Sequence, residues 1–541
     1  TCTITKAAHG LAVGDIVQLD SVTLPGGTGF TNADFEDKNF QVIAVPTTGT
    51  FTIDQASSAS GTVSTGGSLS IKPYEPVGPR EQTYGYGWGM DPYGNGNWGE
   101  AAAASDVTLE PGLWSLSNFG EVLVATILNG KTFTWNSGIS QRLTTRASST
   151  TSNFQTTNNP TKTRVSLISP TTRHLIHLGT ETIIGTPDSQ DDMFIRFSDQ
   201  EDINTYAPTA VNTAGTQRLQ DGTKIIGAIK AKEVILIWTD NALYTMKFIG
   251  APFTFAVEQV GTNCGLIGQN AVVEIDGAAF WLSPKGFFLY DGTVKSIPCT
   301  VEDFVFDNFD TTKGQQVTAG LNNLFTEITW YYPSSSSDYN DKYVVFNFGE
   351  SPGVAGGVWY TGTEARTSWM DATTYPNPYA TKYDSTANGT FPVIVGQSGL
   401  GQTTYFEHEV GTDQVNPNGT TTTVTSSIES YDIDLEQRQR DAKGRASGPK
   451  VAGEVFIAVR RFIPDFKTLQ GNSKISLDVK RYPQQASKTS TYSPFTVNAN
   501  TIKKDTRARG RFVSLKIENV NSSESWRFGT FRLDVQPDGR R

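Results

Sequence analysis

Histidines are the side chains best suited to acid–base or metal chemistry, and this chain has only four of them in 541 residues. His174 and His177 lie three positions apart in a stretch that alternates like a strand. We therefore expect their side chains on opposite faces, where they cannot hold one ion together. His408 stands between two glutamates, and the same alternation places it opposite both carboxylates, while His9 lies in a predicted turn. The positions of the four histidines therefore indicate neither a catalytic residue nor a metal site.

A group of four carboxylates between residues 302 and 310 offers a second possible chemistry, because such a group suits a cation or a pair of catalytic acids. Three phenylalanines are interleaved with them. This mixture favours a short helix or strand with one buried side and one solvated acidic side. The carboxylates are Glu302, Asp303, Asp307 and Asp310, and the aromatic residues are Phe304, Phe306 and Phe309.

The common sequence signatures of enzymes are absent. There is no H-E-x-x-H motif, no Walker-type phosphate loop and no dinucleotide fingerprint. The three cysteines, Cys2, Cys264 and Cys299, are too few and too far apart for a disulfide framework or a four-ligand zinc site, so we expect free thiols. The sequence thus predicts a protein that is not an enzyme and that has no cofactor and no bound metal.

The C-terminal region has the most distinctive pattern, in which arginines are interleaved with aromatic residues. Arginines two positions apart project from one face of a strand. Such a face fits nucleic acid, but it fits ion pairs with another protein equally well. We favour protein–protein contact because the rest of the chain is acidic. The predicted assembly interface consists of Arg507, Arg509, Arg511, Trp526, Arg527, Arg540 and Arg541.

Charge is distributed unevenly along the chain, whose net charge is −10. Residues 421–541 contain 22 Lys and Arg against 13 Asp and Glu, a net charge of +9. The first 420 residues contain 22 basic and 41 acidic residues, a net charge of −19. Such asymmetry marks a boundary and indicates that the two parts face different surroundings. The overall acidity argues against a dedicated nucleic-acid-binding protein.

Short runs of β-branched and aromatic residues, separated by Gly, Asn, Asp and Pro, predict an all-β fold. Hairpins are expected at residues 122–135, 233–248, 278–290 and 343–360. They recur roughly every 40–50 residues, which is typical of the blades of a β-propeller. A large sandwich is the competing architecture, since strand spacing alone does not separate the two. The best candidate for a short helix is residues 436–443.

The sequence predicts a β-propeller-like body with a small N-terminal β module and a C-terminal β domain. The module covers residues 1–72, a connecting segment rich in glycine and aromatic residues covers 73–112, and the body covers 113–420. Residues 421–541 form a basic β region that completes the body or packs on it. No apolar run approaches the ~20 residues of a membrane-spanning helix, so we expect no integral helical membrane protein.

Several segments, in a fixed order, resemble the tail nozzle, or packaged-DNA stabilisation, proteins of short-tailed phages (podoviruses). In the body these are MFIRFSDQEDINTYAP (193–208), EVILIWTDNALYTMKFIGAP (233–252) and GAAFWLSPKGFFLYDG (277–292). Later segments are YFEHEVGTD (405–413), RFIPDF (461–466) and RARGRF with WRFG and PDGRR (507–541). The resemblance extends from about residue 113 to the end. The leading module is similar to small β insertions common in phage structural proteins.

The resemblance implies a structural protein of the virion tail, with a β-propeller subunit that assembles as a homo-oligomer, a hexameric ring. The ring lies below the portal and the tail adaptor, extends the DNA-ejection channel, retains the packaged genome and anchors fibre or spike proteins. An acidic lumen would repel phosphate, so viral DNA would pass through without sequence-specific binding. No membrane partner is implied.

A second function stays open from the residues. Folds rich in Trp and Tyr often present sugar-binding surfaces, and the chain has ten Trp and 19 Tyr. The alternative is therefore a carbohydrate-binding or glycan-degrading β-propeller, or a receptor-binding tail protein. A ring seen in electron micrographs would favour the nozzle, whereas glycan binding or depolymerisation by a monomer would favour the alternative.

Overall fold

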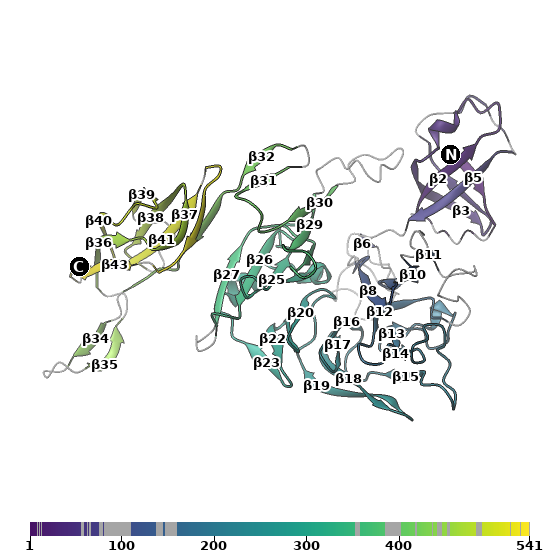
Figure 1. Cartoon of the computed structure of the whole chain (residues 1–541), viewed down its shortest axis with the longest axis horizontal. Coiled ribbons are helices and arrows are strands. Elements are labelled where there is room, and N and C mark those ends of the chain that lie inside the picture. Colours follow the sequence, from purple (N-terminus) through teal and green to yellow (C-terminus); the bar gives the residue numbers. More distant parts are fainter. Residues whose placement is uncertain are drawn as a thin grey trace, which may run out of the picture. The chain divides into compact units, whose positions relative to one another are not determined.

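Strands dominate the chain in the computed structural model (Figure 1), which confirms the predicted all-β class. The structure describes residues 1–7, 9, 11, 13, 15–55, 59–61, 63, 66–74, 79–80, 110–136, 144–145, 159–351, 357–384, 402–416, 419–434, 437–440, 446–451, 455–482, 490–519, 521–530 and 532–539. In these residues the only α-helix is α1 (Glu302–Phe306). The chain divides into two units, Thr1–His408 and Glu409–Arg541.

The N-terminal module is a five-stranded antiparallel sheet in the order β1-β4-β3-β2-β5. Residues at alternate positions of β2 and β4 are buried, as expected for strands with one face on a core. Phe40 and Phe51 are fully buried in that core. The elements are β1 (Cys2–Thr5), β2 (Ile16–Thr23), the 3₁₀-helix η1 (Asn32–Asp34), β3 (Asn39–Thr47), β4 (Thr50–Ile53) and β5 (Ser68–Tyr74).

Six antiparallel sheets follow one another along the described residues between 114 and 407, and we number them one to six. Sheet one contains β8 (Trp114–Phe119), β9 (Val122–Ile127), β10 (Thr132–Asn136) and β11 (Thr144–Thr145). Sheet two contains β12 (Thr163–Ile168), β13 (Leu175–Thr180), β14 (Phe194–Phe197) and β15 (Gly215–Arg218). Sheet three contains β16 (Ile225–Lys230), β17 (Ile235–Thr239), β18 (Ala242–Gly250) and β19 (Thr254–Thr262).

The other three sheets continue the series. Sheet four contains β20 (Val272–Ile275), β21 (Ala278–Ser283), β22 (Gly286–Tyr290) and β23 (Val294–Ile297). Sheet five contains β24 (Thr318–Asn322), β25 (Glu327–Tyr332), β26 (Lys342–Asn347) and β27 (Val358–Gly362). Sheet six contains β28 (Ser368–Met370), β29 (Tyr379–Asp384) and β30 (Gln402–Glu407). The 3₁₀-helices η4 (Pro187–Ser189) and η5 (Thr311–Gln316) lie in connections.

The arrangement of these sheets is that of propeller blades. Each sheet is an up-and-down meander whose first strand lies at one edge. These edge strands neighbour one another in chain order: β8 lies beside β12, β12 beside β16, β16 beside β20, β20 beside β24 and β24 beside β28. Sequential sheets around a common centre are the β-propeller architecture, so the sandwich alternative for the body is wrong.

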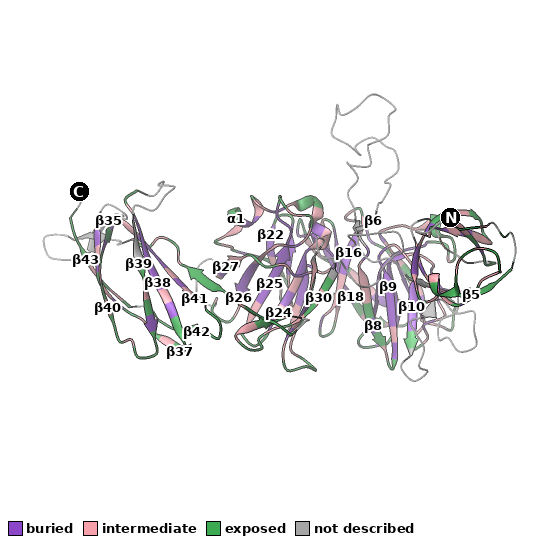
Figure 2. Cartoon of the chain, turned by 90° about the horizontal axis from the view of Figure 1, so that it is seen from above, coloured by how far each residue is buried: buried purple, intermediate pink, exposed green. Residues whose placement is uncertain are grey.

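The apolar sequences of the middle strands follow from this packing, because each middle sheet is covered on both faces. β17 reads ILIWT and all five of its residues are buried. Trp238, Trp281 and Trp330 come from sheets three, four and five, and none exposes any surface. All three belong to one apolar cluster that runs across these sheets. Figure 2 shows buried residues along strands of these sheets such as β25 and β26.

The predicted hairpins of the body are confirmed, but their turns are not uniform. Asn129 in the β9–β10 turn has φ of 54°, the left-handed conformation that Asn-Gly turns favour. The Asp240-Asn241 turn between β17 and β18 contains no left-handed residue. There the Thr239 hydroxyl oxygen accepts from the backbone N–H groups of Asn241 (3.2 Å) and Ala242 (2.8 Å), which shapes the turn through a side chain.

The second unit contains two facing antiparallel sheets. Its four-stranded sheet contains β33 (Ser426–Glu429), β41 (Phe512–Asn519), β38 (Asn472–Lys480) and β39 (Ser490–Asn498). Its three-stranded sheet contains β40 (Lys504–Gly510), β36 (Ile457–Ile463) and β43 (Arg532–Pro537). Val459 and Phe462 on one sheet share an apolar core with Leu477 and Ile517 on the other. We call this unit the C-terminal sandwich.

Three shorter strand pairs complete the C-terminal unit. They are β31 (Asp413–Val415) with β32 (Thr421–Thr423), β34 (Gln437–Arg440) with β35 (Ala446–Val451), and β37 (Phe466–Gln470) with β42 (Ser525–Phe528). Asp413 accepts from the Ser522 hydroxyl and the Ser523 N–H, both at 2.9 Å. The sandwich unit therefore begins before residue 421, where the charge pattern placed the basic region.

One expectation from the sequence is wrong, and another falls largely on residues that the structure does not describe. The helix expected at residues 436–443 is wrong, because Gln437–Arg440 pairs as β34 with β35 and strand pairing overrides helix propensity there. Of the connecting segment 73–112, only the ends and the pair β6 (Pro79–Arg80) and β7 (Glu110–Pro111) are described. The glycine- and aromatic-rich residues 84–98 lie outside the described residues. No helix in the described part of the chain has the length and hydropathy needed to cross a membrane.

Candidate functional site

Two residues of the predicted basic interface lie on the outer face of the three-stranded sheet of the sandwich. Arg507 and Arg509 lie on β40 and are exposed, while Ala508 and Gly510 between and after them are buried. This alternation places both arginines on the solvent side of the sheet, as the sequence predicted. Arg507 makes no hydrogen bond or ion pair with any described residue, so its charge is available.

Arg511 is not part of that strand, because β40 ends at Gly510. It is half-buried in the turn before β41, and its N–H donates to the Lys480 carbonyl at 3.0 Å. Its guanidinium carbon lies 5.1 Å from the centre of the Phe456 ring, and that of Arg509 lies 4.7 Å from the same ring. Arg509 also donates to the Asp538 carboxylate. Two of the predicted interface arginines thus hold contacts within the sandwich.

The remaining predicted residues fall into three environments. Trp526 on β42 packs against the apolar core of the sandwich, so its ring is engaged inside the unit. Arg527 follows it, is exposed, and has no ion pair with a described residue. Arg540 and Arg541 lie outside the described residues. The structure brings Arg507 and Arg509 together on one face and places Arg527 on a different strand pair.

A cross-strand ion pair balances part of the charge on this face. Arg461 on β36 donates to Asp505 on β40 at 2.6 Å, and the two residues are paired in the register of the sheet. This hydrogen bond lowers the pKa of Asp505 and raises that of Arg461. The face is therefore a mixed network with a basic excess, suited to polar contact at the rim of an interface.

The histidines of sheet two are structural. His174 and His177 expose no surface. The His174 ring nitrogens lie 2.7 Å from the Thr172 hydroxyl and 3.0 Å from the Thr213 hydroxyl. His177 Nε2 lies 3.0 Å from the Tyr206 hydroxyl. Burial, together with the nearby Arg196 charge, lowers the pKa of His177 to about 3, so the ring is neutral at neutral pH.

The other two histidines also serve local structure. Arg366 Nε donates to His408 Nε2 at 2.9 Å, which leaves that nitrogen as an acceptor. Burial and the Arg366 charge lower the pKa of His408 to about 4. In the N-terminal module, His9 Nδ1 accepts from the Leu11 N–H at 3.0 Å. The predicted separation of His174 and His177 holds, since each ring has its own partners.

The acidic group at residues 302–310 forms a short helix, as its pattern suggested, but the expected buried aromatic side is incomplete because Phe304 is 56% exposed. Val305 and Phe309 are buried, whereas Asp303 and Asp307 are exposed. Asp310 instead begins η5, where its carboxylate accepts from the Thr312 N–H at 3.1 Å. The four carboxylates therefore serve a solvated helix and a helix start.

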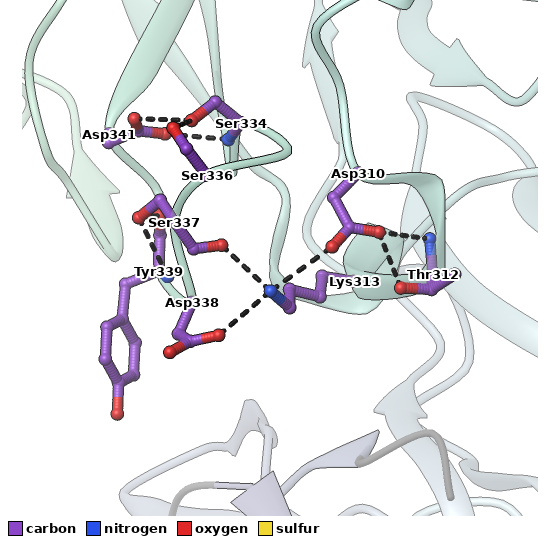
Figure 3. A network of polar contacts seen from close by, with 9 residues as sticks. All are labelled: Asp310, Thr312, Lys313, Ser334, Ser336, Ser337, Asp338, Tyr339 and Asp341. Carbon is purple, nitrogen blue, oxygen red and sulfur yellow. Dashed lines mark hydrogen bonds and ion pairs between the residues drawn. The ribbon is translucent and has the colours of Figure 1, made fainter. Parts of the chain in front are cut away.

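Lys313 links η5 to the β25–β26 loop, as Figure 3 shows. Its ammonium lies 3.2 Å from Asp310, 3.0 Å from Asp338 and 2.9 Å from the Ser337 carbonyl. Burial alone would lower the pKa of Lys313, but these hydrogen bonds raise it. In the same loop, Asp341 accepts from Ser334 through both of its oxygens, at 2.7 Å each. The network fixes a loop and presents no unpaired nucleophile.

Metal and thiol chemistry find little support. Asp20, Glu36 and Asp37 in the N-terminal module approach one another closely enough to share an ion. Glu36 already accepts from the N–H groups of Ser21 (2.9 Å) and Val22 (2.6 Å), and Asp20 pairs with Lys72. Burial raises the pKa of all three cysteines, that of Cys299 to about 12, so the thiols are protonated at neutral pH.

Sequence reasoning missed an exposed ribbon on sheet three. β17 pairs with β18 only as far as Met246, whereas β18 and β19 stay paired out to Gly250 and Thr254. The last residues of the hairpin therefore extend beyond the sheet as two strands. At its tip, Ile249 is 53% exposed and Phe253 is 73% exposed. The signal was present in the sequence: a hairpin tip that reads IGAPF lacks the polar residues usual in turns.

A second missed surface is the outer face of sheet six. Met370, Tyr379 and Glu407 align across its three strands, and Tyr405 lies diagonally beside Tyr379. The rings of Tyr379 and Tyr405 stack with centres 5.2 Å apart. Tyr405 is 62% exposed and Met370 is 43% exposed. The opposite face carries Trp369, whose indole donates to the Leu321 carbonyl of sheet five at 2.8 Å, so only one face is covered.

Comparisons with known proteins give no family. No protein-family model matches the chain, and no curated protein matches it significantly. The solved structures to which it is similar include BamB from Moraxella catarrhalis, at 13% identity and a TM-score of 0.27 over 55% of this chain and 83% of that one. They also include the AfRom2 CNH domain, at 10% identity and a TM-score of 0.32 over 62% and 92% of the two chains.

A third similar structure is an exo-β-1,3-galactanase from Phanerochaete chrysosporium with β-1,3-galactotriose, at 9% identity and a TM-score of 0.20 over 78% and 95% of the two chains. All three TM-scores are below 0.5, so these similarities carry no argument about function. The sheet order described above is what identifies the body as a β-propeller.

Proposed function

We propose that this chain is a structural, non-enzymatic subunit of a phage tail nozzle. In this role a homo-oligomeric ring of six copies extends the DNA-ejection channel below the portal and the tail adaptor, retains packaged DNA and anchors fibre or spike proteins. The location is the virion tail.

The observation that carries the proposal is where the resembling segments fall. Residues 233–252 comprise the β17–β18 hairpin, and residues 277–292 comprise the β21–β22 hairpin of the next sheet. Residues 193–208 contain β14 of the preceding sheet. The resemblance therefore coincides with consecutive sheets of the body. Each of these segments covers strands within one sheet, as expected if the resemblance reflects a shared blade pattern.

The charge distribution supports a role as a conduit. The acidic excess lies in the first 420 residues and the basic excess in the last 121. A surface of net negative charge repels the phosphate backbone and lets DNA slide. The basic sandwich provides a counter-surface for acidic neighbours in an assembly.

The buried histidines support the non-enzymatic part of the proposal. His174 and His177 are fully enclosed and hydrogen-bonded, so no substrate reaches them. The pH-tunable groups most often used in general acid–base catalysis are thus committed to folding at these positions.

Electron microscopy of the purified full-length chain tests the proposal. We expect rings of six copies with a central opening in negative stain, and binding of those rings to a purified portal–adaptor complex. A monomer that binds glycans on an array, or depolymerises a polysaccharide, would instead support the carbohydrate-binding or glycan-degrading alternative. Labelling of the subunit on virion tails would separate a nozzle from a receptor-binding tail protein.

A further inference from the structure

We propose that the β18–β19 ribbon of one copy docks on the outer face of sheet six of a second copy. The ribbon offers Lys247, Ile249 and Phe253, and the sheet face offers Met370, Tyr405 and Glu407. This inference deepens the proposed function and rests on it, because it names the contact that would link neighbouring subunits of the ring.

The ribbon is built to hold its tip rigid. Thr254, at the base of the tip, has φ of 60°, a left-handed conformation that is costly for a β-branched residue. Its hydroxyl donates to the Thr213 carbonyl at 3.0 Å, and its side chain is almost fully buried. Thr213 is in turn held by His174. The strained residue is held by the neighbouring loop of sheet two, which fixes the backbone at the base of the tip.

Aromatic packing beneath the tip adds to this rigidity. Phe248 and Phe255 face each other across the ribbon, with ring centres 5.8 Å apart. Phe255 also packs against Phe197 at 5.0 Å and against His174 at 5.1 Å. An apolar tip that is ordered before binding loses little conformational entropy on binding, which is the property of an anchor residue.

The sheet face matches the tip in chemistry. Met370, Tyr379 and Tyr405 form an apolar strip on a solvent-exposed sheet face, and exposed apolar surface of this kind marks interaction sites. Glu407 lies beside the strip and is exposed. One of its oxygens accepts from the Tyr379 hydroxyl at 3.1 Å, which orients the carboxylate at the edge of the aromatic surface.

Charge complementarity indicates that the partner of the sheet-six face is the ribbon of a second copy of the chain. Lys247 is the only charged residue from position 242 to position 257 and makes no ion pair with a described residue. The ribbon is thus an apolar tip with one free cation, and the sheet face is an apolar strip with one exposed carboxylate. Both surfaces are exposed in a single copy, so neither covers the other there. The match therefore joins two copies.

Such a contact is heterologous, because two different surfaces of the chain meet. Heterologous contacts repeat from copy to copy and close into a ring when the rotation between copies permits. A closed ring leaves no ribbon or sheet face unpaired. This is the geometry that a tubular channel requires.

Charge reversal tests the contact in the full-length chain. Lys247→Glu and Glu407→Lys should each weaken self-association in sedimentation velocity by roughly tenfold or more, since like charges would then face each other. The double variant K247E/E407K restores opposite charges and should recover most of the association. Phe253→Ser should abolish it. Lys232→Glu, an equal change at another exposed lysine of sheet three, is the matched control and should leave association unchanged.

The outcomes separate this contact from the proposed function. Rings that persist in all three single variants would overturn the contact and leave the nozzle proposal standing. Association that depends on Lys247 and Glu407 but never closes into a ring would keep the contact and overturn the nozzle. Failure of the double variant to recover, with thermal unfolding unchanged, would overturn the pairing. So would Phe253-dependent binding to phosphatidylcholine vesicles with self-association unchanged in Phe253→Ser.

Discussion

The propeller body and the C-terminal sandwich are both built from antiparallel strands, yet they place polar groups differently. In sheet two of the body, polar side chains such as His177 and Glu181 are fully buried and hydrogen-bonded to residues of the connecting loops. In the sandwich, the core shared by the two sheets is apolar, and ion pairs such as Arg461–Asp505 lie on the outer face of the three-stranded sheet, although Ser476 and Asp478 of the four-stranded sheet are also buried. The contrast shows that strand content does not determine where a protein keeps its charge.

The difference follows from how each region is covered. A middle blade is packed on both faces, so a polar residue in it must find partners inside the protein. The three-stranded sheet of the sandwich has one free face, where charged residues remain solvated and ion pairs contribute little. We therefore expect substitutions in the body to change its stability strongly, and substitutions on the sandwich face to change assembly.

The largest effect is expected in the body core. Trp330 is fully buried, its indole donates to the Ala271 carbonyl at 3.1 Å, and its ring packs 5.1 Å from that of Phe287. Trp330→Ala should lower the free energy of unfolding of the body by about 3–5 kcal/mol, through lost burial and the cavity left behind. Differential scanning calorimetry should show the body transition shifted and the sandwich transition in place.

Trp135→Ala is the control for that substitution. Trp135 lies in sheet one and is 37% exposed, so its loss should cost much less. Equal decreases in the unfolding temperature of the body for Trp330→Ala and Trp135→Ala would mean that the body is not packed as tightly as its buried strands indicate.

The second-largest difference between the body and the sandwich is expected in how their stability changes at acidic pH. The pKa of buried His177 is lowered to about 3, below the roughly 6.5 of an unfolded chain. Between these values the unfolded state binds a proton and the folded state does not. The contribution of neutral, buried His177 to the free energy of unfolding of the body is therefore fully present above pH 6.5. It is lost as pH falls toward 3. At pH 5 the loss from this one residue is about 2 kcal/mol.

The C-terminal unit contains no histidine, so its stability should not show this dependence. His177→Gln keeps a partner for Tyr206 but does not titrate. Unfolding of the variant by urea at pH 7 and pH 5 should show a smaller acid loss for the body than in the wild-type chain. An unchanged difference between the two pH values would contradict the assignment to His177.

The third effect concerns assembly through the sandwich. Arg507 and Arg527 are exposed and have no ion pair within the described part of the chain. Arg507→Glu with Arg527→Glu should reduce ring or tail assembly by roughly tenfold, because charge complementarity governs association rate and specificity. Sandwich stability should be unchanged, since neither side chain enters the core. Normal incorporation of the double variant into tails would rule out these arginines as interface residues.

Much of the fold was predictable from the sequence, because the two strands of a hairpin and the turn between them are encoded by residues close together in the chain. The runs around Val122, Ile235 and Ala278 all became paired strands near the expected limits. The helix expected at residues 436–443 failed, because pairing with β35 depends on a contact that local propensity does not encode.

The candidate site was less predictable. The alternation of Arg507 and Arg509 identified an exposed face, but the engagement of Trp526 in the core depends on how β42 packs. Local patterns did not identify the ribbon or the face of sheet six. The exposure of the ribbon depends on where β17 stops pairing with β18, and that of the face depends on which side of sheet six packs on sheet five. Local patterns predict which residues share a face, whereas the sheet order decides whether that face is covered.

The smallest effect is expected for a single arginine of the outer sandwich face. Arg509 is exposed, and it pairs with the carboxylate of Asp538 and lies over the ring of Phe456. Its replacement by alanine should lower the stability of the sandwich by no more than about 1 kcal/mol, because solvent screens the ion pair and an exposed cation–π contact adds little. Urea unfolding in low and high salt measures this directly. The difference between wild type and Arg509→Ala should shrink as salt rises. A loss that is larger than for Trp330→Ala, or that is independent of salt, would mean that the sandwich depends on its surface charges as the body depends on its core.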